Sequence, residues 1–321
     1  MLTEAHRLSF GTSALGGLYR PIAPEAVESV LEAAWAGGIR YFDTAPHYGN
    51  GAAEHHLGRF LRGREGWVIS TKVGRILTPE ANPPAVVNGF HSALPFRQHF
   101  DFTYDGIMRS VEDSYQRLGL NRIDILFVHD IGDPGAGTDT KEHRAQLLSS
   151  GARVLEALKS SGAIGAVGLG VNTVEICEEL IGQMPIDLIL LAGRYTLLDR
   201  SAEARLFPLA ERHGIRFMMG GVFNSGILAT GPIPGAHYDY APASEAILAR
   251  ARTLEAVCAR HNTPLAAAAL QFPGRHPLVA STLIGTGKAS SLSRNLTQAA
   301  APLPDALWAA LDAAALSEKE A

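Results

Sequence analysis

Residues 104–129 read YDGIMRSVEDSYQRLGLNRIDILFVH, and this stretch contains the unit from which the fold is built. Its first part, residues 104–118, spaces apolar side chains at helical intervals among charged ones. Gly119 follows at a position where helices commonly end, because glycine accepts a left-handed conformation easily. Residues 123–129 then form a nearly continuous apolar run, which is typical of a strand covered on both faces. A helix followed by such a strand predicts an α/β protein with a parallel sheet.

The same alternation runs along the whole chain. Strands are predicted at residues 8–12, 41–43, 67–72, 123–129, 166–170, 188–191, 216–219 and 279–284. Helices are predicted at residues 24–36, 52–61, 104–118, 151–160, 174–181, 202–213, 244–259 and 290–298. Eight strands that are each followed by a helix predict a closed (β/α)8 TIM barrel. An open doubly wound sheet is disfavoured, because residues 11–17 lack the glycine spacing of a dinucleotide fingerprint.

We expect one barrel domain over residues 1–321, with an additional helix near residues 304–316 packed outside it. Three segments, 74–103, 130–149 and 223–243, are too long for simple barrel loops. Each follows the C-terminal end of a predicted strand, which is the face where barrel enzymes build their sites. These long loops therefore predict a walled pocket at that face.

Composition narrows the possible partners. The formal net charge is −4 and there is no long run of Lys or Arg, which argues against nucleic acid or an anionic membrane as partner. No apolar stretch reaches the length of a membrane span, and the first residues do not resemble a signal peptide. We therefore expect a cytoplasmic enzyme whose two cysteines, Cys177 and Cys258, are reduced. The oligomeric state stays open.

Three consecutive predicted strands end in ionisable residues: Asp43, Lys72 and His129. Tyr48 follows in the loop after the first of them. Each alone has an ordinary explanation, such as a capped turn or a polar strand end. Neighbouring strands are only ~4.8 Å apart, however, so the four side chains can converge at one mouth of the barrel.

This combination suits proton transfer. A tyrosine titrates near pH ~10, too high for proton exchange near neutrality, and a nearby ammonium favours its phenolate form. A carboxylate keeps the lysine charged and in place, while a histidine can orient a substrate oxygen. The residues Asp43, Tyr48, Lys72 and His129 therefore predict a catalytic cluster that handles the proton accompanying hydride transfer.

Residues 41–49, YFDTAPHYG, resemble the signature of the aldo-keto reductase superfamily. Glu54 before Leu57-Gly58, residues 70–72 and the histidine that ends the fourth strand resemble it as well. The similarity runs from the first strand to Asn295. The resemblance implies a barrel oxidoreductase that uses a nicotinamide cofactor.

The resemblance also implies residue roles. Tyr48 becomes the general acid/base, Lys72 and Asp43 tune it, and His129 orients the substrate. The family's cofactor contacts fall on Gly16, Asn172, Arg194, Tyr195, Phe223, Asn224, Ser225, Gly226, Gly285, Thr286, Gly287, Lys288, Arg294 and Asn295.

Three departures concern the cofactor. Val171 stands where the family more often has Ser, Ala192-Gly193 replaces the usual Gln, and Phe223 stands near the usual stacking Tyr. Members that prefer NADP place basic residues just after the eighth strand and at position 291, where this chain has Gly285 and Ser291. NAD is therefore favoured, and NADP stays possible through Lys288.

The segments 168–172, 191–198 and 221–226 resemble the sugar 1-dehydrogenase branch. This implies oxidation of the anomeric carbon of an aldose, such as L-fucose, L-galactose or D-arabinose, to its lactone. His47, Arg75 and His129 are the expected substrate contacts, and Gln98 and His237 are further polar candidates.

Several alternatives stay open. Within the enzyme class they are a pyridoxal 4-dehydrogenase and a general carbonyl reductase. Outside it, a barrel that holds cofactor without turnover would serve as a binding protein. A metal-dependent hydrolase is disfavoured, because no His-x-His ends the first strand and His55 and His56 point to different sides of a helix. No metal site is predicted.

Overall fold

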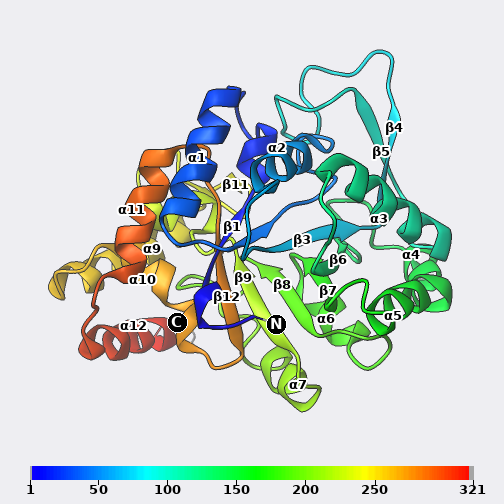
Figure 1. Cartoon of the computed structure of the whole chain (residues 1–321). Helices are drawn as coiled ribbons and strands as arrows, with labels where there is room; N and C mark the ends of the chain where they lie inside the picture. Colours follow the sequence, from blue (N-terminus) through cyan, green and yellow to red (C-terminus); the bar gives the residue numbers. More distant parts are fainter. Residues whose placement is uncertain (1, 318–321) are drawn as a thin grey trace.

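The computed structural model describes residues 2–317, and its centre is a closed barrel of parallel strands (Figure 1). Around the barrel the strand order is β1-β12-β9-β8-β7-β6-β3-β2. The barrel strands are β1 (Leu8–Gly11), β2 (Tyr41–Asp43), β3 (Val68–Val73), β6 (Ile125–His129), β7 (Ala166–Val171), β8 (Leu188–Ala192), β9 (Arg216–Gly220) and β12 (Val279–Ile284). The predicted (β/α)8 fold is confirmed. The expected domain span included Met1 and residues 318–321, which lie outside the described residues.

Helices surround the barrel (Figure 1). They are α1 (Pro24–Ala36), α2 (Ala52–Leu61), α3 (Tyr104–Leu118), α4 (Lys141–Gln146), α5 (Ala152–Ser160), α6 (Val174–Leu180), α7 (Leu206–Arg212), α8 (Ile227–Thr230), α9 (Glu245–Arg260), α10 (Leu265–Gln271), α11 (Ala289–Ala300) and α12 (Asp305–Ser317). Single turns of tighter or wider helix are η1 (Glu4–His6), η2 (Ser13–Gly16), η3 (Leu147–Gly151), η4 (Asn224–Gly226) and η5 (Pro273–Arg275).

Two parts of the sequence-based assignment need correction. Helix α10 was not predicted, although Pro264 stands at its N-cap. The segment 130–149 is not a loop throughout, because α4 begins at Lys141 and continues through the wide turn η3 into α5. Thr140 explains the early start, since its side chain accepts a hydrogen bond from the backbone N–H of His143 and so caps the helix.

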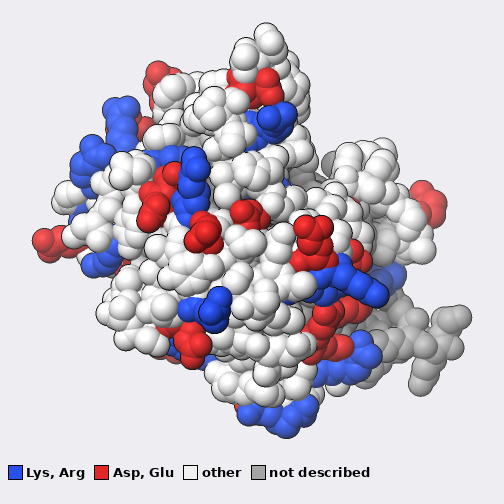
Figure 2. All heavy atoms as spheres, turned by 90° about the vertical axis from the view of Figure 1, so that its right-hand side faces the viewer, with Lys and Arg blue, Asp and Glu red and all other residues white. Residues whose placement is uncertain are grey.

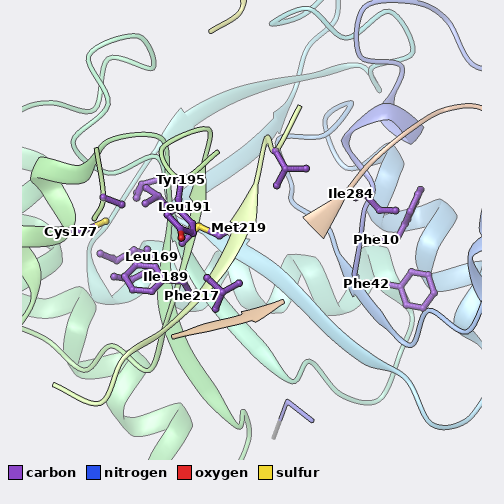
Figure 3. Packing of buried hydrophobic residues seen from close by; sticks show 14 of the residues in the cluster. Phe10, Phe42, Leu169, Cys177, Ile189, Leu191, Tyr195, Phe217, Met219 and Ile284 are labelled. Atoms are coloured by element: carbon purple, nitrogen blue, oxygen red, sulfur yellow. The ribbon is translucent and has the colours of Figure 1, made fainter. Parts of the chain in front are cut away.

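The core has two layers because successive strand residues face opposite sides of the sheet. One cluster packs residues of alternate strand positions into the barrel interior: Tyr41, Ile125, Phe127, Ala166, Leu188, Leu190 and Met218. A larger cluster fills the space between strands and helices, and Figure 3 shows part of it around Leu169, Leu191 and Phe217. The inward-facing set determines which side chains reach the mouth of the barrel.

The other two long segments contain small hairpins. After β3, strands β4 (Arg75–Pro79) and β5 (Phe96–Phe100) pair antiparallel and project at the upper right of Figure 1. After β9, α8 is followed by the short hairpin β10 (His237–Tyr238) and β11 (Ala241–Pro242). Both hairpins follow C-terminal strand ends, so they stand around the same mouth of the barrel.

Outside the site, the chain has ordinary surface and core features. Acidic and basic side chains are interspersed on the face drawn in Figure 2. Within residues 2–317, no helix is long and apolar enough to cross a membrane, and no cluster of three or more potential metal ligands was found. Both cysteines are buried and free, as expected.

Candidate active site

A cavity of about 1010 Å³ opens at the C-terminal ends of the barrel strands. Its floor is the last inward-facing residue of each strand: Gly11, Asp43, Lys72, His129, Gly170, Ala192, Gly220 and Leu283. The three ionisable members come from the neighbouring strands β2, β3 and β6. The members from β7, β8 and β9 are glycine or alanine. One half of the floor is therefore polar and the other half is nearly flat.

The four predicted catalytic residues meet in the polar half. Lys72 Nζ donates to Asp43 Oδ2 at 2.6 Å and to the Tyr48 hydroxyl at 3.0 Å. Its third hydrogen bond, at 2.9 Å, goes to the carbonyl oxygen of Thr44. The His129 ring lies 6.0 Å from the Tyr48 ring and nearly perpendicular to it. Two of the three ammonium hydrogens thus fix Lys72 itself, and the third is directed at the Tyr48 hydroxyl at the floor of the cavity.

The turn that presents Tyr48 is held from behind by Gly16. A Cβ atom on Gly16 would lie 2.6 Å from the carbonyl carbon of Tyr48, so only glycine allows this approach. Gly16 does not line the cavity. The structure places this predicted cofactor contact under the tyrosine, where it supports the turn.

Helix α2, which follows this turn, is anchored by the buried carboxylate of Glu54. Arg117 Nε donates to Glu54 Oε2 at 2.5 Å, and the Thr71 hydroxyl donates to Oε1 at 2.7 Å. These bonds tie α2 to α3 and to β3, the strand that carries Lys72. The signature residue Glu54 therefore acts on the geometry of the site from outside it.

Burial and charge determine the ionisation of the cluster. Burial raises the pKa of Tyr48, Lys72 lowers it, and the net direction is above the ordinary value. Burial alone would lower the pKa of Lys72, but Asp43 and Tyr48 raise it above its ordinary value, so the ammonium stays charged. Lys72 therefore acts in the expected direction, but burial keeps Tyr48 protonated at neutral pH.

Both histidines near Tyr48 are neutral. Burial, together with the positive charges of Arg75 and Lys72, lowers the pKa of His129 well below its ordinary value. Burial and Arg75 likewise lower the pKa of His47 to about 3. A neutral imidazole can donate one hydrogen bond and accept another, which suits contacts with hydroxyl or carbonyl oxygens.

The predicted substrate residues belong to a polar network that reaches the β4–β5 hairpin. His47 Nδ1 lies 2.9 Å from Gln98 Oε1, and Arg75 Nη1 donates to the same oxygen at 3.0 Å. Arg75 Nη2 donates to Asp130 Oδ2. His237, in contrast, is exposed and does not line the cavity.

Sequence reasoning missed Asp130, which lines the cavity directly after His129. It also missed the aromatic wall Tyr240, which comes from the long segment 223–243. The sequence does place Asp130 directly after His129 at the end of an apolar strand. An aspartate at the start of a loop is common in turns, however, so this position alone did not indicate a site residue.

Most predicted cofactor residues line the rest of the cavity. These are Asn172, Phe223, Asn224, Ser225, Gly226, Gly285, Thr286, Arg294 and Asn295. Among the described residues, no group donates a hydrogen bond to the buried Oδ1 atom of Asn224. A buried acceptor of this kind beside a cavity is available to a ligand.

Four others lie elsewhere. Tyr195 is 4% exposed and packs among core side chains, beside Leu191 and Met219 in Figure 3. Gly287 faces Ile22 and Ala14 instead of the cavity, and Lys288 is exposed at the N-cap of α11. No contact of these three with a ligand follows from their positions.

Arg194 is the fourth, and it acts from behind the lining. It donates to the carbonyl oxygen of Asn172 at 2.7 Å and pairs with Asp199 and Asp239. Asp239 belongs to the β10–β11 hairpin turn, which also carries Tyr240. Arg194 therefore fastens this hairpin to the end of β7.

A barrel with a Tyr–Lys–Asp cluster at its mouth defines a class of enzyme, and the chain belongs to the aldo/keto reductase family. The model of that family matches residues 7–316. It is an oxidoreductase family whose enzymes use nicotinamide cofactors.

Among curated proteins, the chain is 44% identical to pyridoxal 4-dehydrogenase of Microbacterium luteolum, over 95% of this chain and 92% of that protein. It is 38% identical to D-threo-aldose 1-dehydrogenase of a Pseudomonas species, over 96% and 94%. L-Galactose dehydrogenase of Arabidopsis thaliana is 26% identical, over 98% and 89%. The expected sugar dehydrogenase branch agrees with these relatives.

The fold is shared with a solved aldo-keto reductase of Bacillus halodurans in its holo form. The TM-score is 0.74 at 23% identity, over 96% of this chain and 91% of that chain.

Proposed function

We propose that this protein oxidises a small cyclic hemiacetal to a lactone, with Tyr48 as the general base. The hydrogen-bonded chain from Asp43 through Lys72 to Tyr48 supports this most directly. In such an oxidation the carbon loses a hydride and its hydroxyl loses a proton. Tyr48 receives the proton, Lys72 stabilises the phenolate that must form first, and the His129 imidazole orients the substrate oxygen.

The flat half of the cavity suits a nicotinamide dinucleotide. Gly170, Ala192 and Gly220 leave room there for a planar ring. Asn172 would hold the carboxamide end, while Arg294 and Asn295 would hold the adenosine end. When bound, the oxidised nicotinamide supplies the hydride acceptor and a positive charge near Tyr48.

We infer that this cofactor is NAD. A Cβ atom on Gly285 would lie 2.9 Å from the carbonyl oxygen of Gly11, so a basic side chain just after β12 meets a steric obstacle. Ser291, the second position, lines the cavity without a charge. Both positions that commonly recognise the additional phosphate of NADP are therefore neutral.

We favour an aldose as substrate, oxidised at the anomeric carbon. His47, Arg75 and Gln98 form a polar wall beside Tyr48, which suits a ring that carries several hydroxyls. Pyridoxal is the second candidate, because the 44% identical relative is named for it. Both compounds carry an aldehyde with a hydroxyl placed to close a cyclic hemiacetal, so both fit the same chemistry.

The test is to follow NADH absorbance after mixing the purified protein with NAD and either L-fucose, L-galactose, D-arabinose or pyridoxal. We expect NADH with an aldose and its loss in Tyr48→Phe. NADH with pyridoxal alone would select the second candidate. No reduced cofactor with any of these compounds, with NAD or with NADP, would contradict the proposed oxidation. Binding of NADH without turnover would then indicate a cofactor-holding protein.

A further inference from the structure

The ion pair between Arg75 and Asp130 lies inside the cavity and has no part in the proton transfer described above. Arg75 Nη2 and Asp130 Oδ2 are 2.5 Å apart, and both residues line the cavity while being more than nine-tenths buried. Taking two charges out of water is costly, and such a pair is weak evidence for stability. Stability alone therefore does not account for this buried pair, and its position beside the cavity favours a role in binding.

The pair stands next to the reacting groups. Asp130 Oδ2 lies 3.5 Å from His129 Nε2. Tyr48 also senses the Asp130 charge, which raises the pKa of the phenol slightly further. A substrate oxygen held between Tyr48 and His129 would therefore have the Asp130 carboxylate as its neighbour.

The backbone holds Asp130 in place at some cost. Its φ of 50° lies in the left-handed region, which aspartate tolerates better than most residues. Its N–H donates to the Gly170 carbonyl oxygen at 2.9 Å, and its own carbonyl accepts from the Thr138 hydroxyl. Strain of this kind clusters at functional sites, where the surrounding structure maintains it.

The partner Arg75 is fixed as firmly by the hairpin. Its guanidinium lies 4.3 Å above the Phe100 ring and donates to Gln98 Oε1. Because Gln98 Oε1 accepts this bond, His47 Nδ1 must donate to it as N–H, which leaves Nε2 of His47 as an acceptor. The wall thus offers a carboxylate, a guanidinium and an imidazole acceptor in fixed positions.

Asp130 retains accepting capacity toward the cavity. Arg75 occupies Oδ2, and among the described residues no side chain or backbone group donates a hydrogen bond to Oδ1, while the residue lines the cavity. A carboxylate oxygen bound by a substrate hydroxyl forms a charge-assisted bond, stronger than a neutral one. Arg75 compensates the negative charge, so the carboxylate does not oppose formation of the Tyr48 phenolate at full strength.

We propose that the Arg75–Asp130 pair binds the hydroxyl group adjacent to the reacting carbon and thereby determines which hemiacetals are accepted. For an aldose this is the 2-hydroxyl, and for pyridoxal it is the ring hydroxyl beside the aldehyde. The inference rests on the proposed hemiacetal oxidation. Asp130 accepts a hydrogen bond from this hydroxyl, and Arg75 keeps the carboxylate ionised and in place.

The test compares each substrate with its analogue that lacks this hydroxyl: L-fucose with 2-deoxy-L-fucose, and pyridoxal with 3-deoxypyridoxal. For the wild type we expect kcat/KM to favour the hydroxylated compound by about 10- to 100-fold, as for a hydrogen bond to a charged group. In Asp130→Asn this ratio falls to a few-fold, because a neutral amide oxygen replaces the charged acceptor.

Two further variants keep the test decisive. The double variant Arg75→Met with Asp130→Asn removes both charges, so no unpaired arginine is left buried to destabilise the protein. This double variant should show the same low ratio of kcat/KM values as Asp130→Asn. The control Asp133→Asn changes a second carboxylate in the cavity, one already bonded to Gly135 N–H and Asn172. It should alter both kcat/KM values by the same factor and preserve the ratio.

The outcomes separate the two ideas. A wild type that oxidises no hemiacetal contradicts the proposed function and this inference with it. A wild type that oxidises hemiacetals, with a selectivity ratio that persists in both Asp130 variants, contradicts this inference alone.

Discussion

At the residue scale, Lys72 does two things at once. It pairs with the buried carboxylate of Asp43 and donates to the hydroxyl of Tyr48. The first contact keeps the ammonium charged, and the second directs that charge at the hydroxyl oxygen that exchanges the proton in the proposed reaction. Because Ser70 donates to Asp43 Oδ1 at 2.7 Å, the carboxylate cannot rotate away from Lys72 freely.

The rate of oxidation should rise with pH through the neutral and into the alkaline range. Burial raises the pKa of Tyr48 above its ordinary value, so at neutral pH only a small fraction is phenolate, and this fraction grows about tenfold per pH unit. Reduction uses the protonated form and should show no such rise. Profiles of kcat/KM in both directions check this; an oxidation profile that is flat from neutral to alkaline pH would contradict it.

Replacing Lys72 by Met should reduce kcat for oxidation by about 10²–10⁴-fold, the usual range for loss of assisted proton transfer. It should also destabilise the protein by roughly 3–5 kcal/mol, because the buried carboxylate of Asp43 loses its positively charged partner. The double variant Asp43→Asn with Lys72→Met should recover most of the stability and none of the activity. Urea unfolding and initial rates measure both; recovered activity would argue against the role of Lys72.

Cofactor choice should respond to one residue at the adenosine end. Ser291→Arg places a positive charge at the cavity lining, where an additional phosphate would lie, so affinity for NADPH should rise by about tenfold, the effect of one charge-assisted bond. The structure favours position 291 over Gly285 for this change because Gly285 faces a backbone oxygen. Titration of both reduced cofactors by fluorescence checks the shift, and equal affinities in the variant and the wild type would refute it.

The direction of a functional side chain could be predicted where its residue ends a barrel strand. Asp43, Lys72 and His129 face inward because the strand period fixes their direction. Tyr195 shows the limit: it follows a strand by a few residues, and its direction depends on the turn, which here sends it into the core. Arg194 and Asp130 depend in the same way on loop partners that are distant in sequence.

At the element scale, one glycine determines how α2 approaches α3. A Cβ atom on Gly58 would lie 1.8 Å from the carbonyl oxygen of Leu118. Helix α2 begins just after the Tyr48 turn, so its packing distance sets the position of the turn. The resemblance to the family signature pointed to this glycine, but only the helix contact gives its reason.

Gly58→Ala should therefore destabilise the protein by roughly 1–3 kcal/mol, the usual cost of overpacking, although alanine favours an isolated helix. Gly274→Ala is the control, because its Cβ meets no atom within 4 Å. Thermal unfolding of both variants measures the difference. Equal melting temperatures for the two variants would show that α2 moves away from α3 without cost.

Element boundaries were predictable where local signals were strong. Helices α1 and α3 match their predicted ranges because a proline in the first turn of α1 and a glycine after each helix mark their ends. The short hairpins were not predictable. The β4–β5 pairing joins residues separated by a long stretch that carries no alternating apolar pattern, so only tertiary contacts define it.

At the scale of the whole molecule, the closed barrel brings strand ends from across the chain to one mouth. This explains why eight repeated strand and helix patterns sufficed to predict the architecture, while the shape of the cavity, which depends on three long segments, did not follow from them. The cavity crosses the whole mouth, from the hairpin beside β3 to α11.

Because the proposed cofactor contacts come from many elements, binding of NADH should raise the free energy of unfolding of the whole barrel. A ligand present at one hundred times its Kd adds about 2.7 kcal/mol to the free energy of unfolding. Calorimetry should show a higher Tm with NADH, and Asn172→Ala should reduce the increase. An unchanged Tm at saturating NADH would contradict the assignment of this cavity to the cofactor.

The division of the cavity has an evolutionary consequence. In the proposed mechanism Asp43, Lys72 and His129 are inward-facing residues of the closed sheet and Tyr48 stands on the turn that follows β2. The three substrate-side residues Arg75, Gln98 and Phe100, in contrast, stand on a hairpin outside the barrel. Mutations in the hairpin can therefore replace the surface that meets the substrate while the proton-transfer groups keep their distances. Directed evolution confined to residues 75–100 should yield descendants with new substrates more readily than mutagenesis spread over the barrel.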